Sequence, residues 1–234
     1  MMPLTLRSAI ATFLFVFCLV APASALPSES TDRDMSICSF ENMQDARKHY
    51  STEQTNISRT GGRGGQVVRN KLQLQLRTRD GLVVLTDNCF DGESYVRYRF
   101  KAYLTDIGYF LIGVDGYEGH GFLLVNDRTG NKTDLEAMPV FSPDRKQFVT
   151  MSMDLDAGYH PNSIQIWQLD PSGPKLGYKV YFDNAWGPSD PVWIDNRTIE
   201  FKKNILVEHG SEYKSSRALL IKKDSTWEIK EPSQ

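Results

Sequence analysis

The chain has few histidines and cysteines, and the patterns in which these residues bind metals or perform catalysis are missing. Its histidines are scattered, without HExxH or His-x-His spacing, at His49, His120, His160 and His209. No Gly-x-Ser-x-Gly segment occurs, and no glycine-rich nucleotide motif follows a strand-like run. These absences disfavour zinc-dependent hydrolysis and nucleotide-dependent chemistry.

An excess of charge of one sign is also missing, and long apolar runs are scarce. The sequence has 27 basic and 29 acidic side chains, a net charge of −2, which argues against nucleic-acid binding. An apolar run from Ala9 to Val20 follows Arg7 and is too short to cross a bilayer comfortably. With the small residues Ala23-Ser24-Ala25 it matches a secretory signal peptide. We therefore expect loss of residues 1–25, leaving a periplasmic or secreted protein without membrane insertion.

Removal of the signal peptide also removes Cys18 and leaves Cys38 and Cys89. Two remaining cysteines in an exported protein usually pair. A catalytic or metal-binding role is the alternative, but neither a CxxC spacing nor clustered histidines support it. We expect a Cys38–Cys89 disulfide that ties the N-terminal arm to the domain that follows.

The mature chain divides into an arm with a glycine-rich linker, residues 26–65, and one β domain, residues 66–234. Within the arm, apolar residues recur at near-helical spacing and predict a short helix: Phe40, Met43, Ala46 and Tyr50. The run Gly61-Gly62-Arg63-Gly64-Gly65 lacks the lysine and hydroxyl residue that end a phosphate-binding loop, so we interpret it as a flexible linker.

Beyond the linker the apolar pattern has a period of two residues, which predicts strands. Leu72, Leu74 and Leu76 alternate with polar residues, and Asp80-Gly81 then supplies a tight turn into Leu82–Thr86. Three further strand-like segments follow, Val96–Ala102, Tyr109–Val114 and Phe122–Val125.

Two segment types repeat along the β domain. Pro139-Val140-Phe141-Ser142-Pro143-Asp144 is echoed by Pro191-Val192-Trp193-Ile194-Asp195, about fifty residues later. A strand, polar turn and strand pattern occurs at Phe122–Lys132, Ile164–Lys175 and more weakly at Leu219–Trp227. Interleaved, these segments give units of four short strands, the content of a propeller blade. We interpret Ser142 and Asp144 as turn-forming residues, because no histidine lies at a spacing that suggests a catalytic partner.

The Ser-Pro-Asp segment, the strand that ends in Asp-x-x-Gly and the Pro-Val-Trp segment together resemble the blade motif of TolB-type propellers. The resemblance covers roughly residues 100–230. The chain differs from the motif at Arg145, where the motif usually has glycine, and at Ile194-Asp195. The resemblance implies an all-β fold, a small or partial β-propeller-like array of about four antiparallel blades. It does not indicate any particular activity.

Three inter-strand segments carry candidate ligand-binding residues. They contribute Asp115, Glu118 and His120, then Asp154, Asp156 and His160, and lastly Trp186 and Asp190. The oxygens of Asp154–Asn162 suggest a Ca²⁺ site, but the glycine and terminal glutamate of an EF-hand loop are missing, and a polar connection is the alternative. Trp186 is either a recognition anchor or packing between blades.

Arg97, Arg99 and Lys101 alternate along one strand and form a candidate anion-binding row. A solvated sheet face is the alternative interpretation. The row, like the loops, is compatible with a protein or glycan partner in the cell envelope.

No nucleophile, base or metal set converges in the sequence. We therefore expect a non-enzymatic binding or interaction module of the bacterial cell envelope, with no cofactor other than the weakly supported Ca²⁺. One alternative is an envelope glycan or peptide hydrolase or lyase that draws carboxylates from several blades. A further alternative is a structural subunit of an envelope complex.

The intact mass of the exported, non-reduced protein tests the signal peptide and the disulfide together. We expect a chain that begins at Leu26 and in which Cys38 and Cys89 are joined. Because no other cysteine remains, iodoacetamide should leave this mass unchanged. Two alkylated cysteines would contradict the disulfide.

Overall fold

The computed structural model describes residues 43–60, 66–89, 92–183, 185–207 and 212–231. Within these residues it contains one helix, α2 (Met43–Thr60), and strands β1 to β15, which form four antiparallel sheets. The predicted signal peptide, Cys38 and the glycine-rich linker lie outside the described residues, so they stay predictions. Cys89 is buried, at 9% exposure.

Each sheet is a meander in which strands that follow one another in the chain also lie side by side. The first sheet contains β1 (Val67–Asn70), β2 (Gln73–Arg77) and β3 (Leu82–Thr86). The second contains β4 (Val96–Leu104), β5 (Tyr109–Gly116), β6 (His120–Asn126) and β7 (Lys132–Leu135). The third contains β8 (Val140–Phe141), β9 (Gln147–Ser152), β10 (Asn162–Asp170) and β11 (Gly173–Phe182). The fourth contains β12 (Gly187–Asp195), β13 (Thr198–Leu206), β14 (Tyr213–Lys223) and β15 (Thr226–Lys230).

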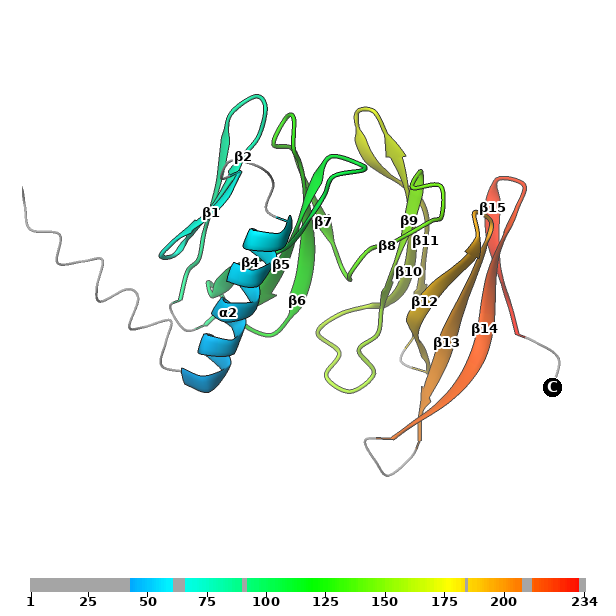
Figure 1. Ribbon diagram of the computed structural model, residues 1–234. Coiled ribbons are helices and arrows are strands. Elements are labelled where there is room, and N and C mark those ends of the chain that lie inside the picture. The colour runs from blue at the N-terminus through cyan, green and yellow to red at the C-terminus, as the bar shows by residue number, and fades with distance from the viewer. Residues whose placement is uncertain (1–42, 61–65, 90–91, 184, 208–211, 232–234) are drawn as a thin grey trace, which may run out of the picture.

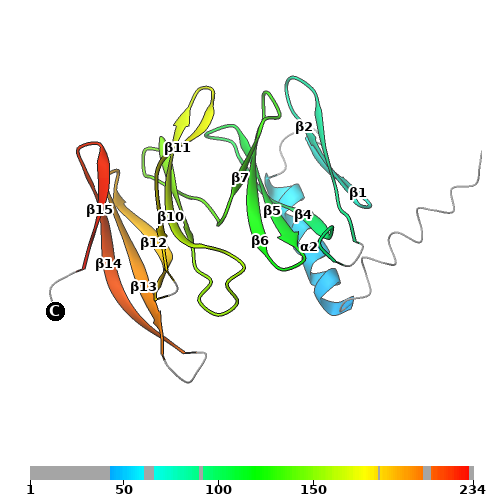
Figure 2. The same ribbon diagram turned by 180° about the vertical axis from the view of Figure 1, so that it is seen from behind.

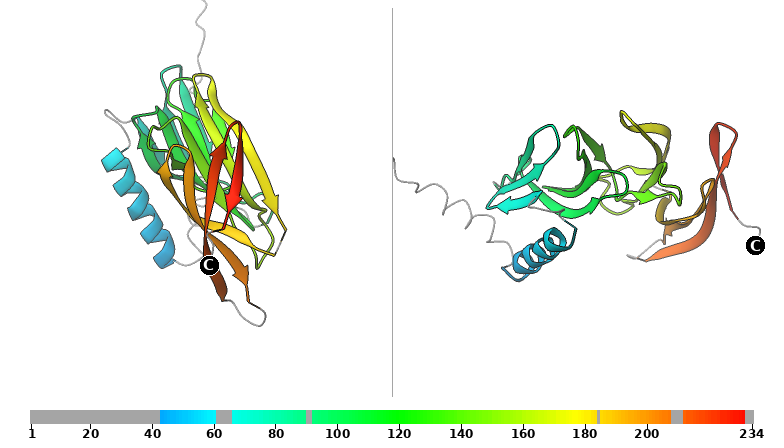
Figure 3. Two further views of the ribbon diagram at one scale, coloured as in Figure 1. Left: turned by 90° about the vertical axis from the view of Figure 1, so that its right-hand side faces the viewer. Right: turned by 45° about the horizontal axis from the view of Figure 1, so that its top comes forward.

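The four sheets stand face to face in one row, with the first and fourth sheets at opposite ends (Figures 1 and 2). The row stays open, because its end sheets do not meet in any of the views, including those of Figure 3. The prediction of a partial, propeller-like all-β array of about four antiparallel units is therefore confirmed.

The two repeated segment types occupy equivalent places in different sheets. The Pro-Val-aromatic segments contribute Val140–Phe141 to β8 and Val192–Trp193 to β12, the first strands of the third and fourth sheets. The strand, turn and strand pattern forms the last two strands of three sheets, the pairs β6–β7, β10–β11 and β14–β15. Repetition in the sequence thus indicated the four-strand unit correctly.

The Ser142 segment is a tight turn between β8 and β9. The Ser142 hydroxyl donates to Asp144 Oδ1 at 2.7 Å, and Lys146 N–H donates to the same carboxylate oxygen at 3.1 Å. Arg145 has a φ of 58°, the left-handed conformation that favours glycine. The interpretation of Ser142 and Asp144 as turn-forming residues is confirmed.

Three apolar layers fill the spaces between neighbouring sheets, because the strands alternate their side chains between two faces. Leu74, Leu76, Phe100 and Ile112 lie between the first and second sheets. Leu111, Leu124, Phe148 and Trp167 lie between the second and third, and Ile164, Ile199, Phe201 and Leu220 lie between the third and fourth. The Trp193 indole N–H also donates to the Val140 carbonyl at 2.8 Å and links β12 to β8.

Helix α2 lies against β4, beside the second sheet (Figures 1 and 3). Its buried or half-buried side chains recur at helical spacing, at Glu53, Asn56 and Ile57, and Ile57 packs against the first apolar layer. The helix has 18 residues and extends to Thr60, well past the short helix predicted around Phe40 to Tyr50. The sequence prediction missed this extension because polar side chains that bond to β4 replace apolar ones on the packed face.

A buried ionic network joins α2 to the first two sheets. Arg69 on β1 donates to Glu53 at 2.9 and 3.0 Å and to Asp87 at 3.2 Å. The side chains of Arg69 and Glu53 are only 5% and 3% exposed. Removing one partner of such a pair leaves a buried charge without compensation.

The same network satisfies the edge of β4 that faces away from β5. Tyr98 N–H donates to Asp87 at 2.8 Å, Phe100 N–H donates to Glu53 at 2.8 Å, and the Tyr98 carbonyl accepts from Arg69. The Asn56 amide donates to the Phe100 carbonyl at 3.3 Å. Val96 on this edge pairs with the Asn88 backbone, and at Tyr98 and Phe100 side chains take the place of a neighbouring strand.

Substitution Arg69→Met should lower the free energy of unfolding by about 3–5 kcal/mol, because Glu53 and Asp87 would remain buried without a counter-charge. Arg217→Met is the matched control, since Arg217 pairs with Glu200 on the surface at 61% exposure and should cost at most about 1 kcal/mol. Urea denaturation of both variants measures the difference. Equal losses would contradict a structural role for the network.

Candidate functional site

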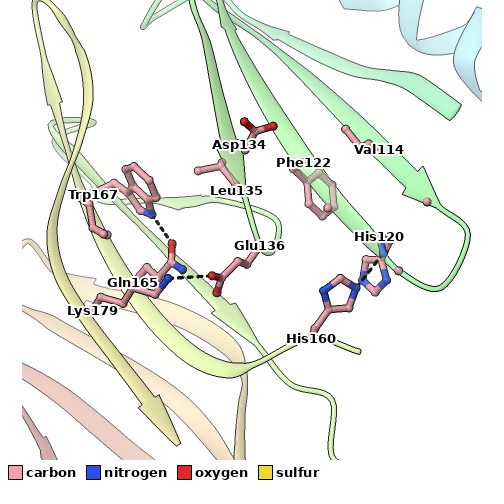
Figure 4. Close-up of a pocket in the computed structure, with 14 residues that line it drawn as sticks. Val114, His120, Phe122, Asp134, Leu135, Glu136, His160, Gln165, Trp167 and Lys179 are labelled. Carbon is pink, nitrogen blue, oxygen red and sulfur yellow. Dashed lines mark hydrogen bonds and ion pairs between the residues drawn. The ribbon is translucent and has the colours of Figure 1, made fainter. Parts of the chain in front are cut away.

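The candidate site is a cleft between the second and third sheets, where two of the predicted loops meet. One loop joins β5 to β6 and ends at His120, and the other joins β9 to β10 and carries His160 (Figure 4). The backbone N–H of His120 donates to His160 Nε2 at 3.0 Å, and the two rings lie edge to face at 5.4 Å. The structure therefore brings two predicted site residues together from different sheets.

Glycine is needed where the two loops touch. A Cβ atom at Gly119 would lie 2.5 Å from His160 Nε2, well inside van der Waals contact. Any side chain at position 119 would therefore push the His160 ring away from the His120 backbone.

Asp154 organises the second loop rather than facing a ligand. Its carboxylate accepts hydrogen bonds from the backbone N–H groups of Ala157, Gly158, Tyr159 and His160, at 2.7 to 3.0 Å. Burial opposes ionisation of Asp154, but the four donors outweigh this effect and lower the pKa of its carboxyl below the ordinary value. Asp154 thus holds His160 in place.

The walls of the cleft are mainly apolar and enclose about 520 Å³. Phe122 and Leu135 come from the second sheet, and Trp167 and Leu176 come from the third. The Trp167 ring stacks on Phe148 at 5.9 Å with an angle of 9° between the planes, which fixes its orientation.

The inner side of the cleft is polar. Gln165 lines it and is 2% exposed, and its Oε1 accepts from the Trp167 indole N–H at 3.1 Å. Thr150 is the cross-strand partner of Gln165 and is 1% exposed. Because directly paired residues share a face of the sheet, both side chains point toward the second sheet. The Thr150 hydroxyl has no hydrogen-bond partner among the described residues.

An ion pair crosses the cleft from one sheet to the other. Glu136, directly after β7, accepts from the Ser163 hydroxyl at 2.6 Å and from Lys179 on β11 at 2.9 Å (Figure 4). Partial burial disfavours the ammonium, but interactions with Tyr181 and Glu136 outweigh it and raise the pKa of Lys179. The ion pair offsets the Glu136 charge inside the cleft.

The other predicted residues of these loops lie outside the cleft. Asp115 is the cross-strand partner of His120 and forms an ion pair with Arg99. Glu118 is exposed in the β5–β6 turn. Asp156 accepts from the Tyr213 hydroxyl at 2.5 Å and thereby links its loop to the fourth sheet. Asp190 pairs with Lys202 on the exposed surface at 2.9 Å.

Trp186 is part of the packing between the third and fourth sheets. Its ring lies 3.8 Å from that of Phe182 and 6.4 Å from that of Phe201, and Lys203 lies over its face at 5.1 Å. Of the two interpretations offered for Trp186, these contacts favour packing between blades.

The cationic row is arranged along β4, but its charges are not equivalent. Arg97 and Arg99 are half-buried, whereas Lys101 is exposed. Arg97 stands opposite Asp115 in the strand register, and Arg99 binds the Asp115 carboxylate. The Lys101 side chain lies over Gly113, whose added Cβ would be 2.7 Å from Lys101 Cε. An acidic partner would therefore have to compete with Asp115.

The described residues contain no group of three or more His, Cys, Asp or Glu side chains that could hold a metal ion. At the proposed Ca²⁺ loop, both carboxylate oxygens of Asp154 already accept two N–H groups each, and Asp156 is bound to Tyr213. This geometry gives the Ca²⁺ hypothesis no support.

Comparison with protein-family models and with curated proteins finds no match for this chain.

Sequence reasoning missed most residues of the cleft, among them Gln165, Trp167, Glu136 and Lys179, and it also missed Thr150 beside Gln165. Each lies in or directly after a strand. In a strand, a polar residue that alternates with apolar residues usually lies on the solvent-exposed face. Gln165 lies between Ile164 and Ile166, and Thr150 lies between Val149 and Met151. A polar side chain inside so apolar a segment was the available signal.

Substitution Asp154→Ala should release the four backbone N–H groups and lower the free energy of unfolding by about 1–2 kcal/mol, as for loss of a helix cap. Hydrogen exchange at Ala157 to His160 should become faster. Asp183→Ala is the matched control, because Asp183 accepts from one loop N–H, at 3.2 Å.

The contribution of the Asp154 carboxylate to the free energy of unfolding should depend on pH. Since the pKa of Asp154 is lower in the folded protein than its ordinary value of 3.8, the carboxylate stabilises the fold above that value. The stabilisation is lost as the pH falls below it. Wild type minus Asp154→Ala stability, measured from pH 7 downward, should shrink below about pH 4, and a constant difference would contradict this assignment.

Proposed function

We propose that this protein is a non-enzymatic binding module of the bacterial cell envelope that takes its ligand in the cleft between the second and third sheets. The observation that carries the proposal is the combination of an apolar wall with a buried polar interior. Trp167 and Leu176 line the cleft with apolar surface, and Gln165 lines it with a buried amide. Beside Gln165, on the same face of the sheet but outside the lining, the Thr150 hydroxyl has no hydrogen-bond partner among the described residues. Buried polar atoms of this kind usually bind water or a ligand.

The chemistry of the cleft disfavours an anionic ligand, because Asp134 lines it as well as Glu136. Glu136 is offset by Lys179, and Gln165 contributes an amide. An apolar face together with amide and hydroxyl groups is well suited to a sugar ring and its hydroxyls. A glycan of the cell envelope is therefore the proposed ligand, and a protein segment is the second choice.

The placement of the carboxylates supports binding over the alternative of a hydrolase or lyase. The predicted carboxylates lie in different places: Asp115 pairs with Arg99, Asp154 accepts from its own loop, Asp156 accepts from Tyr213, and Asp190 pairs with Lys202. General acid and base catalysis requires acidic groups within reach of one substrate bond.

A second candidate function, a structural subunit of an envelope complex, is favoured by the outer face of the first sheet. Val68, Leu82 and Val84 are 44%, 57% and 41% exposed. The register places Val68 and Val84 on either side of Gln75, so they form one patch.

The envelope location is part of the proposal and derives from the signal-peptide pattern at the start of the sequence. No helix among the described residues is long and apolar enough to span a membrane.

Titration with soluble peptidoglycan fragments, followed by tryptophan fluorescence and calorimetry, tests the proposed ligand. Leu176→Gln should weaken binding about tenfold, because loss of one apolar contact in a binding pocket typically costs on the order of 1–2 kcal/mol. Val192→Gln is the matched control, an exposed aliphatic residue on β12 at 57% exposure. Equal affinities for both variants, or no binding to the fragments, would contradict a glycan site in the cleft.

A further inference from the structure

A second hollow lies at the opposite end of the strands from the cleft, where hairpin turns of three successive sheets meet. These turns join β2 to β3, β6 to β7 and β10 to β11, and the hollow encloses about 800 Å³. We call it the turn hollow. It is lined by polar and charged residues, in contrast to the apolar walls of the cleft.

Backbone hydrogen bonds hold the first two turns together. Arg79 N–H donates to the Asp127 carbonyl at 2.8 Å, and Asp80 N–H donates to the Arg128 carbonyl at 2.9 Å. Gly130 has a φ of 74°, and a Cβ there would lie 2.7 Å from the Val83 side chain. The backbone positions of Arg79 and Arg128 are therefore fixed relative to each other before any ligand arrives.

Three cationic side chains line the turn hollow: Arg79, Arg128 and Lys132. None of them forms an ion pair with a carboxylate within the described parts of the chain. Two acidic residues line it as well, Asp80 and Asp127, and Asp127 accepts from the Tyr103 hydroxyl at 2.7 Å. The hollow thus has one more positive than negative charge, although the whole chain carries −2.

Hydroxyl residues of two turns also line the hollow, Thr129 from the β6–β7 turn and Ser172 from the β10–β11 turn. Their hydroxyls donate within their own turns, to Asn126 and Asp170, and so hold the turns in shape. Guanidinium groups bind oxyanions through paired N–H groups, and a lysine ammonium adds a point charge. Two arginines and one lysine match a group with several acceptor oxygens and more than one negative charge.

We propose that the turn hollow binds a phosphate group through Arg79, Arg128 and Lys132. This site is separate from the glycan cleft and does not depend on the function proposed for it. The phosphate is either soluble, as the free ion or an ester, or belongs to the headgroup of an anionic lipid.

The test is an NMR titration of the mature protein with inorganic phosphate, because amide shifts show where the ion binds. The amides of Thr129 and Ser172 should shift and saturate. Lys132→Gln and Arg128→Gln should each weaken binding about tenfold, the expected loss of one charge-assisted contact. Lys214→Gln is the matched control, an exposed lysine on β14, and should change the affinity less than about twofold.

Two results of this titration would contradict a site for soluble phosphate. One is the absence of any shift in the three turns, and the other is an equal loss of affinity in Lys132→Gln and Lys214→Gln. The side chains of Arg128, Lys132 and Lys214 are exposed. The three variants should therefore keep the wild-type melting temperature, so that a loss of binding is not caused by misfolding.

Vesicle binding separates the two sources of phosphate. Sedimentation with phosphatidylglycerol vesicles but not with phosphatidylcholine vesicles, lost in Arg128→Gln, would assign the site to lipid headgroups. Binding of inorganic phosphate without vesicle binding would assign it to soluble phosphate. Failure of both probes contradicts the site, whatever the outcome with peptidoglycan fragments.

Discussion

The Arg69 guanidinium lies where helix α2, the first sheet and the free edge of β4 come together. It binds Glu53 and Asp87, and these carboxylates in turn accept the Phe100 and Tyr98 N–H groups. An open row of sheets leaves strand edges without neighbours, and such edges invite pairing with other chains. The network closes one of these edges with side chains and, by doing so, fixes where the helix must lie.

Burial of the three charged side chains has a cost in desolvation free energy, and the pKa of Asp87 reflects this cost. Burial raises the pKa of Asp87 even though Arg69 acts in the opposite direction. Ionic networks of this kind contribute less to stability than to the choice of one arrangement. Here the arrangement chosen is the placement of β4 and β5, from which β6, His120 and one wall of the cleft follow. The packed interior is fixed, and the cleft and the turn hollow, the two proposed binding sites, lie at opposite ends of the same strands.

Much of the fold could be predicted from the sequence, because the alternation of apolar and polar residues and the turn-forming residues act on local structure. The Asp80-Gly81 turn gave the β2–β3 hairpin, and the repeated segments gave the four-strand unit. The Arg69 network was not readable, since Glu53, Arg69 and Asp87 are far apart in the chain and each looks like an ordinary surface charge. For the same reason the pairing of Glu136 with Lys179 escaped prediction. Asp154 was predicted as a ligand-binding residue, whereas its four hydrogen bonds are internal to its loop.

The most direct test of this account is native-state hydrogen exchange at the free edge of β4. If side chains replace a neighbouring strand, the Tyr98 and Phe100 amides should exchange only through global unfolding, as slowly as the amides of β5 at the centre of the same sheet. Exchange of these two amides as fast as that of exposed turn amides such as Thr129 would show that the edge is open, and would contradict the central role of the Arg69 network.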